Sequence, residues 1–193
     1  MSERLPAILE HVVSAGHAVF TRGLYNLNIV GIRTPDDSAN TFNDGLVVAY
    51  KDEHGWITRG PWKWTTDPGT YYRLRPMNVE GTAIMCPGQY RGAYQIGLHR
   101  GTPGLRQVGP VRIWRDNNRD AILDMDPSTV DTGRYAMNIH RSSSTESTVV
   151  DRWSAGCQVA ARSADMDCLL SLCRKSAELY GPRFTYTLIE ANV

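Results

Sequence analysis

Short β-forming runs separated by turn residues constrain the fold of this chain more than any other feature. The runs are rich in β-branched and aromatic side chains, and glycine, proline, asparagine or aspartate separates most of them from the next. Runs with this punctuation predict strands joined by tight turns. The predicted strands cover residues 26–33, 45–50, 56–65, 82–86, 90–99, 111–114, 121–124, 135–140 and 184–189.

Two segments have helical rather than strand periodicity. Apolar residues from Leu5 to Phe20 recur near 3.6-residue spacing and predict an amphipathic helix over roughly residues 3–22. Residues 164–180 predict a second helix, which Gly181 and Pro182 end. We therefore expect one mostly β domain over residues 1–193, with the helix of segment 1–24 packed on it and a second helix near the C-terminus.

Composition excludes several classes of function. The chain has 193 residues, of which 41% are hydrophobic and 21% charged, as expected for a globular domain. Its net charge of +1 gives no general attraction for nucleic acid or anionic lipid. The first residues lack the basic and apolar regions of a signal peptide, and no apolar run reaches the ~20 residues of a membrane span. We expect a monomer that is made in a host cytoplasm, does not bind nucleic acid and does not insert into a membrane.

The four cysteines do not predict a disulfide scaffold or a zinc site, because they form no CxxC pair and no Cys/His cluster. Cys168 and Cys173 lie on the predicted second helix and are expected to be core thiols. The segment Asp116–Asp120 resembles the start of a calcium loop but lacks its central glycine and final glutamate, so a solvated turn is the simpler interpretation. No metal or other cofactor is expected.

His140 and Cys157 are the residues that point to chemistry. His140 ends a predicted strand, a loop rich in serine and threonine follows, and Cys157 closes a turn that begins at Ser154. A thiol becomes a strong nucleophile when a neighbouring imidazole takes its proton. Gly156 permits a sharp turn with unobstructed N–H groups, as an oxyanion site requires. Each residue alone could be an ordinary core or polar residue, but their order, their spacing and the flanking serine favour a catalytic pair.

In this order and spacing, His140 and Ser154-Ala155-Gly156-Cys157 resemble the motif of the L,D-transpeptidase (YkuD) family, a strand histidine followed by a Ser-His-Gly-Cys turn. Papain-like and NlpC/P60-type peptidases place the cysteine first. Segments 65–71 and 87–96 both resemble the family's Thr-Pro-x-Gly-x-Phe/Tyr strand, and we favour the second. Ala155 replaces the motif's histidine and Val159 its usual arginine, and both changes concern substrate contacts.

The resemblance implies an L,D-transpeptidase-like β-sandwich and assigns roles. Cys157 would be the nucleophile, and His140 the general base and later acid, oriented by the backbone carbonyl of Arg141. The N–H groups of Ala155, Gly156 and Cys157 would stabilise the oxyanion, with Ser154 flanking them. The thiolate of this family attacks a carbonyl of a peptidoglycan stem peptide, and the acyl-enzyme passes to an amine or to water.

Five further residues are expected to contact the substrate: Tyr94, His99, Tyr135, Asn138 and Trp153. Alternatives remain for several of them, since Trp153 could pack in the core, His99 could lie on the surface, and strand alternation must turn some of these side chains away. Trp62 and Trp64 could form a sugar-stacking platform, although a buried strand face is the simpler interpretation. The preference for arginine over lysine suits an acidic peptide substrate, but a GC-rich genome also explains it.

With no export signal and no wall-binding module, the resemblance implies a phage endolysin-like peptidoglycan peptide hydrolase. It would be made in the host cytoplasm and would act on stem-peptide or cross-link bonds of the wall after release. One alternative is an L,D-transpeptidase that forms cross-links. Another is a wall-binding or virion protein without catalytic activity.

Overall fold

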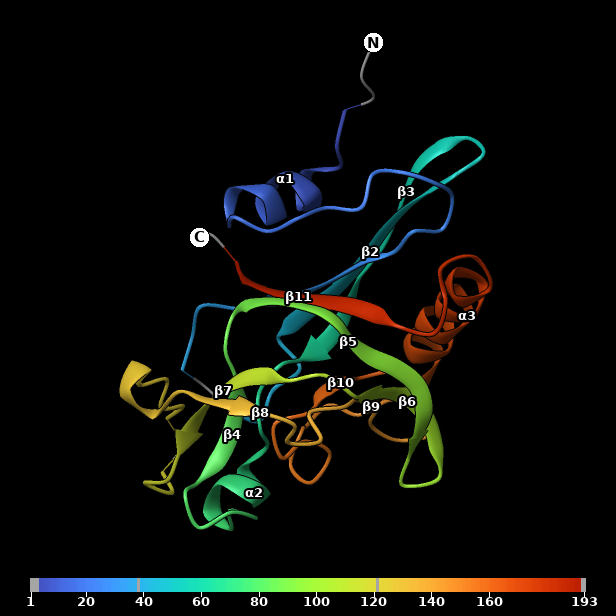
Figure 1. Ribbon diagram of the computed structural model, residues 1–193. Helices are drawn as coiled ribbons and strands as arrows, with labels where there is room; N and C mark the ends of the chain where they lie inside the picture. Colours follow the sequence, from blue (N-terminus) through green and yellow to red (C-terminus); the bar gives the residue numbers. More distant parts are fainter. Residues whose placement is uncertain (1–3, 38, 121, 192–193) are drawn as a thin grey trace.

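The computed structural model describes residues 4–37, 39–120 and 122–191, and these residues form mostly strands, as the sequence predicts (Figure 1). Eight strands form a closed barrel in the order β1-β11-β5-β6-β9-β10-β3-β2. Their bounds are β1 Asn28–Arg33, β2 Asp44–Asp52, β3 Gly55–Thr65, β5 Gly88–His99, β6 Thr102–Gln107, β9 Ile139–Arg141, β10 Gln158–Ala160 and β11 Phe184–Glu190. A second sheet has the order β4-β7-β8, with β4 Thr82–Met85, β7 Val111–Asp116 and β8 Asp131–Gly133.

The larger sheet is a closed barrel, whereas the sequence analysis expected a β-sandwich. The pairing of β1 shows how the sheet closes. This strand pairs antiparallel with β2 along one edge and parallel with β11 along the other. The strand nearest the N-terminus and the strand nearest the C-terminus therefore become neighbours, and the larger sheet has no free edge at that point. The smaller sheet lies at the lower left of Figure 1, below the barrel.

The helices agree with the prediction in place but not always in length. Helix α1 covers Ala7–Ser14 rather than residues 3–22, and its buried Leu9 and Val12 face the protein. It ends near Gly16, which has a φ of +80° that a continuing helix cannot accommodate. Residue 3, where the predicted helix begins, lies outside the described residues.

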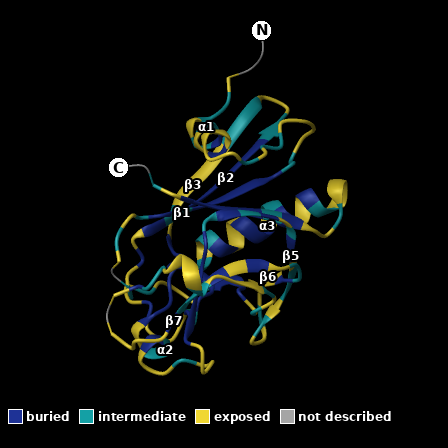
Figure 2. Ribbon diagram, turned by 60° about the vertical axis from the view of Figure 1, so that its left-hand side comes forward, coloured by how far each residue is buried: buried dark blue, intermediate teal, exposed yellow. Residues whose placement is uncertain are grey.

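Helix α3 covers Ser163–Tyr180, as predicted, and ends at Gly181 with a φ of +83°. Figure 2 shows its buried face against the barrel and its exposed face toward solvent. Cys173 is buried as expected, whereas Cys168 is exposed, because the two residues fall on different faces of the helix. The short helix α2, Thr70–Leu74, was not predicted.

Three barrel strands are the weakest points of the sequence prediction. Strand β6 contains Pro103 and Gly104, which reduce its β-forming signal, and it was missed. The predicted strand 135–140 shortens to β9, because Ala136 has a φ of +57° that interrupts an extended chain. Strand β10 has only three residues.

A strand was also predicted over residues 121–124, outside the barrel. Residues 122–124 do not form an extended strand, and residue 121 lies outside the described residues.

Large apolar side chains fill the barrel, and Trp64 is one that is fully buried. Its burial excludes the sugar-stacking platform considered for Trp62 and Trp64, because a stacking ring must be open to its ligand. No helix of the described residues is both long enough and apolar enough to cross a bilayer.

Candidate active site

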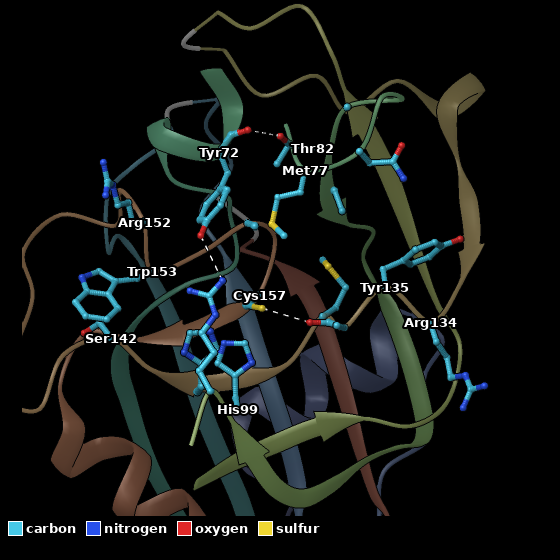
Figure 3. A pocket seen from close by; sticks show the side chains of 18 of the residues that line it. Tyr72, Met77, Thr82, His99, Arg134, Tyr135, Ser142, Arg152, Trp153 and Cys157 are labelled. Atoms are coloured by element: carbon cyan, nitrogen blue, oxygen red, sulfur yellow. Dashed lines mark hydrogen bonds between the residues drawn. The ribbon is translucent and has the colours of Figure 1, made fainter. Parts of the chain in front are cut away.

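A pocket of about 620 Å³ lies beside β9 and β10. Its walls come from helix α2 and the loop after it, from the β5–β6 turn, and from the loops that precede β9 and β10. Figure 3 shows Cys157 at its centre, with Arg152 and Trp153 on one side and Tyr135 and Arg134 on the other. His140 also lines this pocket, so the predicted nucleophile and base share one cavity.

Strand register explains why the two side chains meet there. Strands β9 and β10 pair in parallel, with His140 opposite Val159. Side chains alternate along a strand, so Cys157, two residues before Val159, lies on the same face as His140. The intervening Gln158 faces the other way, and its Oε1 accepts a hydrogen bond of 2.8 Å from Tyr186 inside the barrel. The candidate pair therefore projects outward from the barrel wall.

The turn before Cys157 is held by Ser154. The Ser154 hydroxyl donates to the Cys157 carbonyl at 2.8 Å and accepts from the Gly156 N–H at 3.1 Å. Gly156 has a φ of +116°, and a Cβ there would lie 2.4 Å from the Ala83 carbonyl oxygen, so only glycine fits. Ser154 is thus fully buried behind the site and shapes the turn rather than contacting the pocket.

This turn corrects one part of the predicted oxyanion site. Because the Gly156 N–H is bonded to Ser154, it is not available to a substrate oxygen. Within the described chain, the N–H groups of Ala155 and Cys157 have no hydrogen-bond acceptor. These two groups remain as candidate oxyanion donors.

Cys157 is a neutral thiol in its resting state. Its Sγ donates to the Ala136 carbonyl at 3.4 Å. Burial raises the pKa of Cys157 to about 11, although the backbone N–H of Asn138 and the charge of Arg100 lower it in part. The thiol therefore needs a base to lose its proton at neutral pH.

His140 has the form of such a base. Its Nδ1 lies 2.7 Å from the Arg141 carbonyl oxygen, the contact that the family resemblance implies. A carbonyl oxygen only accepts, so Nδ1 carries the proton and Nε2 is left with a free lone pair. Nε2 is buried and has no partner in the described residues. Burial lowers the pKa of His140 to about 4 despite this hydrogen bond, so the ring stays neutral at ordinary pH.

Asn138 and His99 support His140 from one side. The Asn138 side-chain oxygen accepts from the Gln107 N–H at 2.9 Å, which fixes the orientation of the amide. Its Nδ2 then donates to His99 Nδ1 at 2.9 Å. The His99 ring stacks on His140, with centroids 4.2 Å apart and planes inclined by 14°.

The structure separates the predicted site residues into two groups. Seven of them line the pocket: His99, Tyr135, His140, Arg141, Trp153, Ala155 and Cys157. Four do not: Tyr94, Asn138, Ser154 and Gly156. The expected contact of Tyr94 with substrate is wrong, because its side chain points into the barrel, where its ring packs edge-on against Tyr186 at 5.8 Å. Trp153 is 42% exposed, which excludes the alternative that it packs in the core.

Arg100, which the sequence offered together with His99 as either a cleft or a surface residue, lines the pocket. Sequence analysis missed Tyr72, Arg134 and Arg152, which also line it, although Arg152 had a local signal because it precedes Trp153. Tyr72 comes from helix α2, which is far from the motif in sequence, so only the fold brings it there.

The segment Asp116–Asp120 holds an arginine rather than a cation site. Nε of the buried Arg73 lies 3.1 Å from an Asp116 carboxylate oxygen, and its NH2 group lies 3.4 Å from an Asp120 oxygen. In the described parts of the chain, no group of three or more His, Cys, Asp or Glu side chains is placed to hold a metal ion.

Comparison of the chain with known protein-family models, with curated proteins and with solved structures finds no match in any of the three. The interpretation of the site therefore depends on its own geometry. That geometry is a thiol, an imidazole with a free ring nitrogen and two free backbone N–H groups beside one cavity.

Proposed function

We propose that this protein is a peptidoglycan peptide hydrolase of the endolysin type, which cleaves stem-peptide or cross-link amides through a Cys157 acyl-enzyme. The observation that carries the proposal is that Cys157 belongs to the same pocket and sheet face as His140, whose Nε2 has no hydrogen-bond partner among the described residues. A buried acceptor without a partner costs free energy, which a role in proton transfer would explain.

The chemistry follows from the neutral resting pair. As Sγ attacks the amide carbon, His140 Nε2 accepts the thiol proton, and the Arg141 carbonyl stabilises the imidazolium through Nδ1–H. The carbonyl oxygen becomes an oxyanion near the N–H groups of Ala155 and Cys157. Nε2 then protonates the leaving amine, which departs and leaves a thioester. Water attacks this thioester while giving a proton to Nε2, and the returning proton regenerates the thiol.

An L,D-transpeptidase-like fold belongs to the same proposal. It is supported by a mostly β chain in which a strand histidine and a Gly-Cys turn lie on adjacent parallel strands. The closed eight-stranded ring is the feature of this chain that a simple two-sheet sandwich does not account for.

Digestion of purified sacculi, followed by mass spectrometry of the soluble fragments, tests this function. We expect new peptide fragments with the wild type, none with Cys157→Ala, and wild-type yields with Cys168→Ala, which alters an exposed thiol on α3. Fragments identical to those of Cys157→Ala would remove the proposal. New cross-linked dimers from tetrapeptide monomers would instead identify a transpeptidase.

One observation favours the alternative of a wall-binding protein without catalysis. The raised pKa of Cys157 and its bond to Ala136 describe a thiol that is unreactive until a base acts on it. This alternative expects sacculus binding that survives Cys157→Ala, with no fragments released by either protein.

A further inference from the structure

The pocket has a strongly one-sided charge. Five arginines line it, and within the described residues no aspartate or glutamate does: Arg100, Arg115, Arg134, Arg141 and Arg152. The chain as a whole has a net charge of only +1, so this concentration is local. A cavity lined by one sign of charge attracts ligands of the opposite sign.

Most of these arginines lack an acidic partner. Of these five arginines, only Arg115 forms an ion pair with a described residue, Asp131, at 3.6 Å. Arg141 donates to the Ser143 carbonyl, and the Arg152 guanidinium lies over the Tyr71 ring at 4.1 Å from its centroid. Their positive charges are therefore not neutralised by the protein.

Arg100 follows His99, whose ring stacks on His140. It occupies the β5–β6 turn directly after His99, with a φ of +47°, and Gly101 follows with a φ of +79°. Two successive residues with positive φ form a tight hairpin turn. The Arg100 NH2 group lies 3.5 Å from the Tyr72 hydroxyl across the pocket. Its charge also lowers the pKa of Cys157 and of His140, as expected for a guanidinium near both groups.

We propose that this pocket selects an acyl donor that carries carboxylate groups, with Arg100 binding the carboxylate beside the attacked carbonyl and Arg152 binding a second one. This inference rests on the proposed function and adds its substrate specificity. A guanidinium binds a carboxylate through two parallel N–H bonds, which fixes the orientation of the ligand as well as its charge. Arg100 would thus hold the reacting carbonyl near Cys157.

Arg100 and Arg152 line the pocket from different segments, the β5–β6 turn and the loop that precedes β10. Arg152 and Trp153 form one side of the pocket in Figure 3, and Cys157 lies between that side and Tyr135. The exposed Trp153 ring beside Arg152 offers apolar contact to the peptide between the carboxylates. A neutral peptide would leave the positive charges of the pocket uncompensated.

Binding to the Cys157→Ala protein tests the inference without turnover. Calorimetry would compare a stem tetrapeptide that has free carboxylates with the same peptide in which they are primary amides. We expect the amidated peptide to bind at least about tenfold more weakly, as for loss of a charged hydrogen bond. Adding Arg100→Gln should reduce that difference to less than about threefold, whereas adding Arg59→Gln, an exposed arginine on β3, should preserve it. Equal affinities of the two peptides for the Cys157→Ala protein would overturn the inference.

A second measurement separates this inference from the proposed function. Glutarate should slow alkylation of Cys157 by iodoacetamide in the wild type but not in Arg100→Gln, and glutaramide should have no effect. Protection by glutarate without digestion of sacculi would sustain the carboxylate site while the proposed function fails. Digestion of sacculi with no preference for free carboxylates would sustain the proposed function and overturn the carboxylate site. Inorganic phosphate protecting more strongly than glutarate would overturn the carboxylate assignment.

Discussion

The imidazole rings of His99 and His140 lie face to face, 4.2 Å apart between centroids. His140 is thus held by two different contacts, the stack on its face and the hydrogen bond from Nδ1 to the Arg141 carbonyl at its edge. Asn138 determines the position of His99 through its side chain, and its backbone N–H approaches Cys157. One residue therefore influences both members of the candidate pair.

Removing His99 should affect catalysis more than substrate binding. In His99→Ala the base loses its stacking partner, and we expect kcat to fall roughly 10- to 100-fold with a smaller change in KM, as for a misplaced catalytic group. The apparent pKa of the acidic limb should rise, because His99 lowers the pKa of His140. His99→Phe keeps an aromatic face and should recover part of kcat. Wild-type kcat in His99→Ala would contradict a positioning role.

Replacing Cys157 should abolish the proposed activity and leave the fold intact. For Cys157→Ala we expect release of peptide fragments from sacculi to fall at least about a thousandfold, as when a nucleophile is deleted. Circular dichroism and thermal melting should remain close to wild type, since a small buried side chain is exchanged for a slightly smaller one. Fragment release within tenfold of wild type would exclude Cys157 as the nucleophile.

The pH dependence should show a neutral catalytic pair. The pKa of His140 is lowered to about 4 and that of Cys157 is raised to about 11, so both groups are uncharged between these values. We expect kcat/KM to rise as His140 loses its proton near pH 4 and then to stay level through pH 8. The ionisation of the thiol itself is measured by the pH dependence of its alkylation with iodoacetamide. The peptide that contains position 157 should carry no label in Cys157→Ala, which assigns the label of the wild type to Cys157. A thiol of the wild type that is fully ionised at pH 7 would contradict this pair.

The lowered pKa of His140 should also make the fold sensitive to acid. The ordinary histidine pKa is about 6.5, so between that value and the folded-state pKa of about 4 the unfolded chain binds the extra proton. Stability should therefore fall as the pH drops through this window, by up to about 3 kcal/mol from this residue. In His140→Gln that part of the loss should disappear. Urea unfolding of both proteins at pH 7, 5.5 and 4 measures the difference.

Gly156→Ala should damage the nucleophile turn through a backbone clash. The added Cβ would lie 2.4 Å from the Ala83 carbonyl oxygen at a φ of +116°. A strained backbone alone costs about 1–3 kcal/mol, so we expect a larger loss of stability together with loss of activity. Gly181→Ala is the matched control, because its φ is +83° but no atom lies within 4 Å of the added Cβ. Equal melting temperatures of the two variants would show that the clash is relieved.

The sequence predicted the fold where local chemistry decides it. Helix α3, its end at Gly181 and the β2–β3 hairpin follow from periodicity and turn residues. Strand β6 was missed because Pro103 and Gly104 are poor strand formers, and neighbouring strands hold it in place. Closure of the barrel depends on pairing of β1 with β11, across most of the chain, and no local pattern specifies such a contact.

The candidate site shows the same division. The order and spacing of His140 and Cys157 predicted that the two residues lie together, and both line one pocket. Tyr94 was wrongly predicted to contact the substrate. The alternation of side chains along a strand separates two faces but does not show which face lies inside the barrel. The sequence also could not show that the Gly156 N–H is taken by Ser154, or that Arg100 and Arg152 share a cavity, since both facts require the folded chain.

The position of β11 between β1 and β5 has a consequence during synthesis. Until residues 184–190 leave the ribosome, two strand edges stay unpaired, and the barrel wall that supports His140 and Cys157 is incomplete. Closure of the barrel must therefore wait until β11 has been made and should be slow, because the pairing of β1 with β11 joins distant parts of the chain.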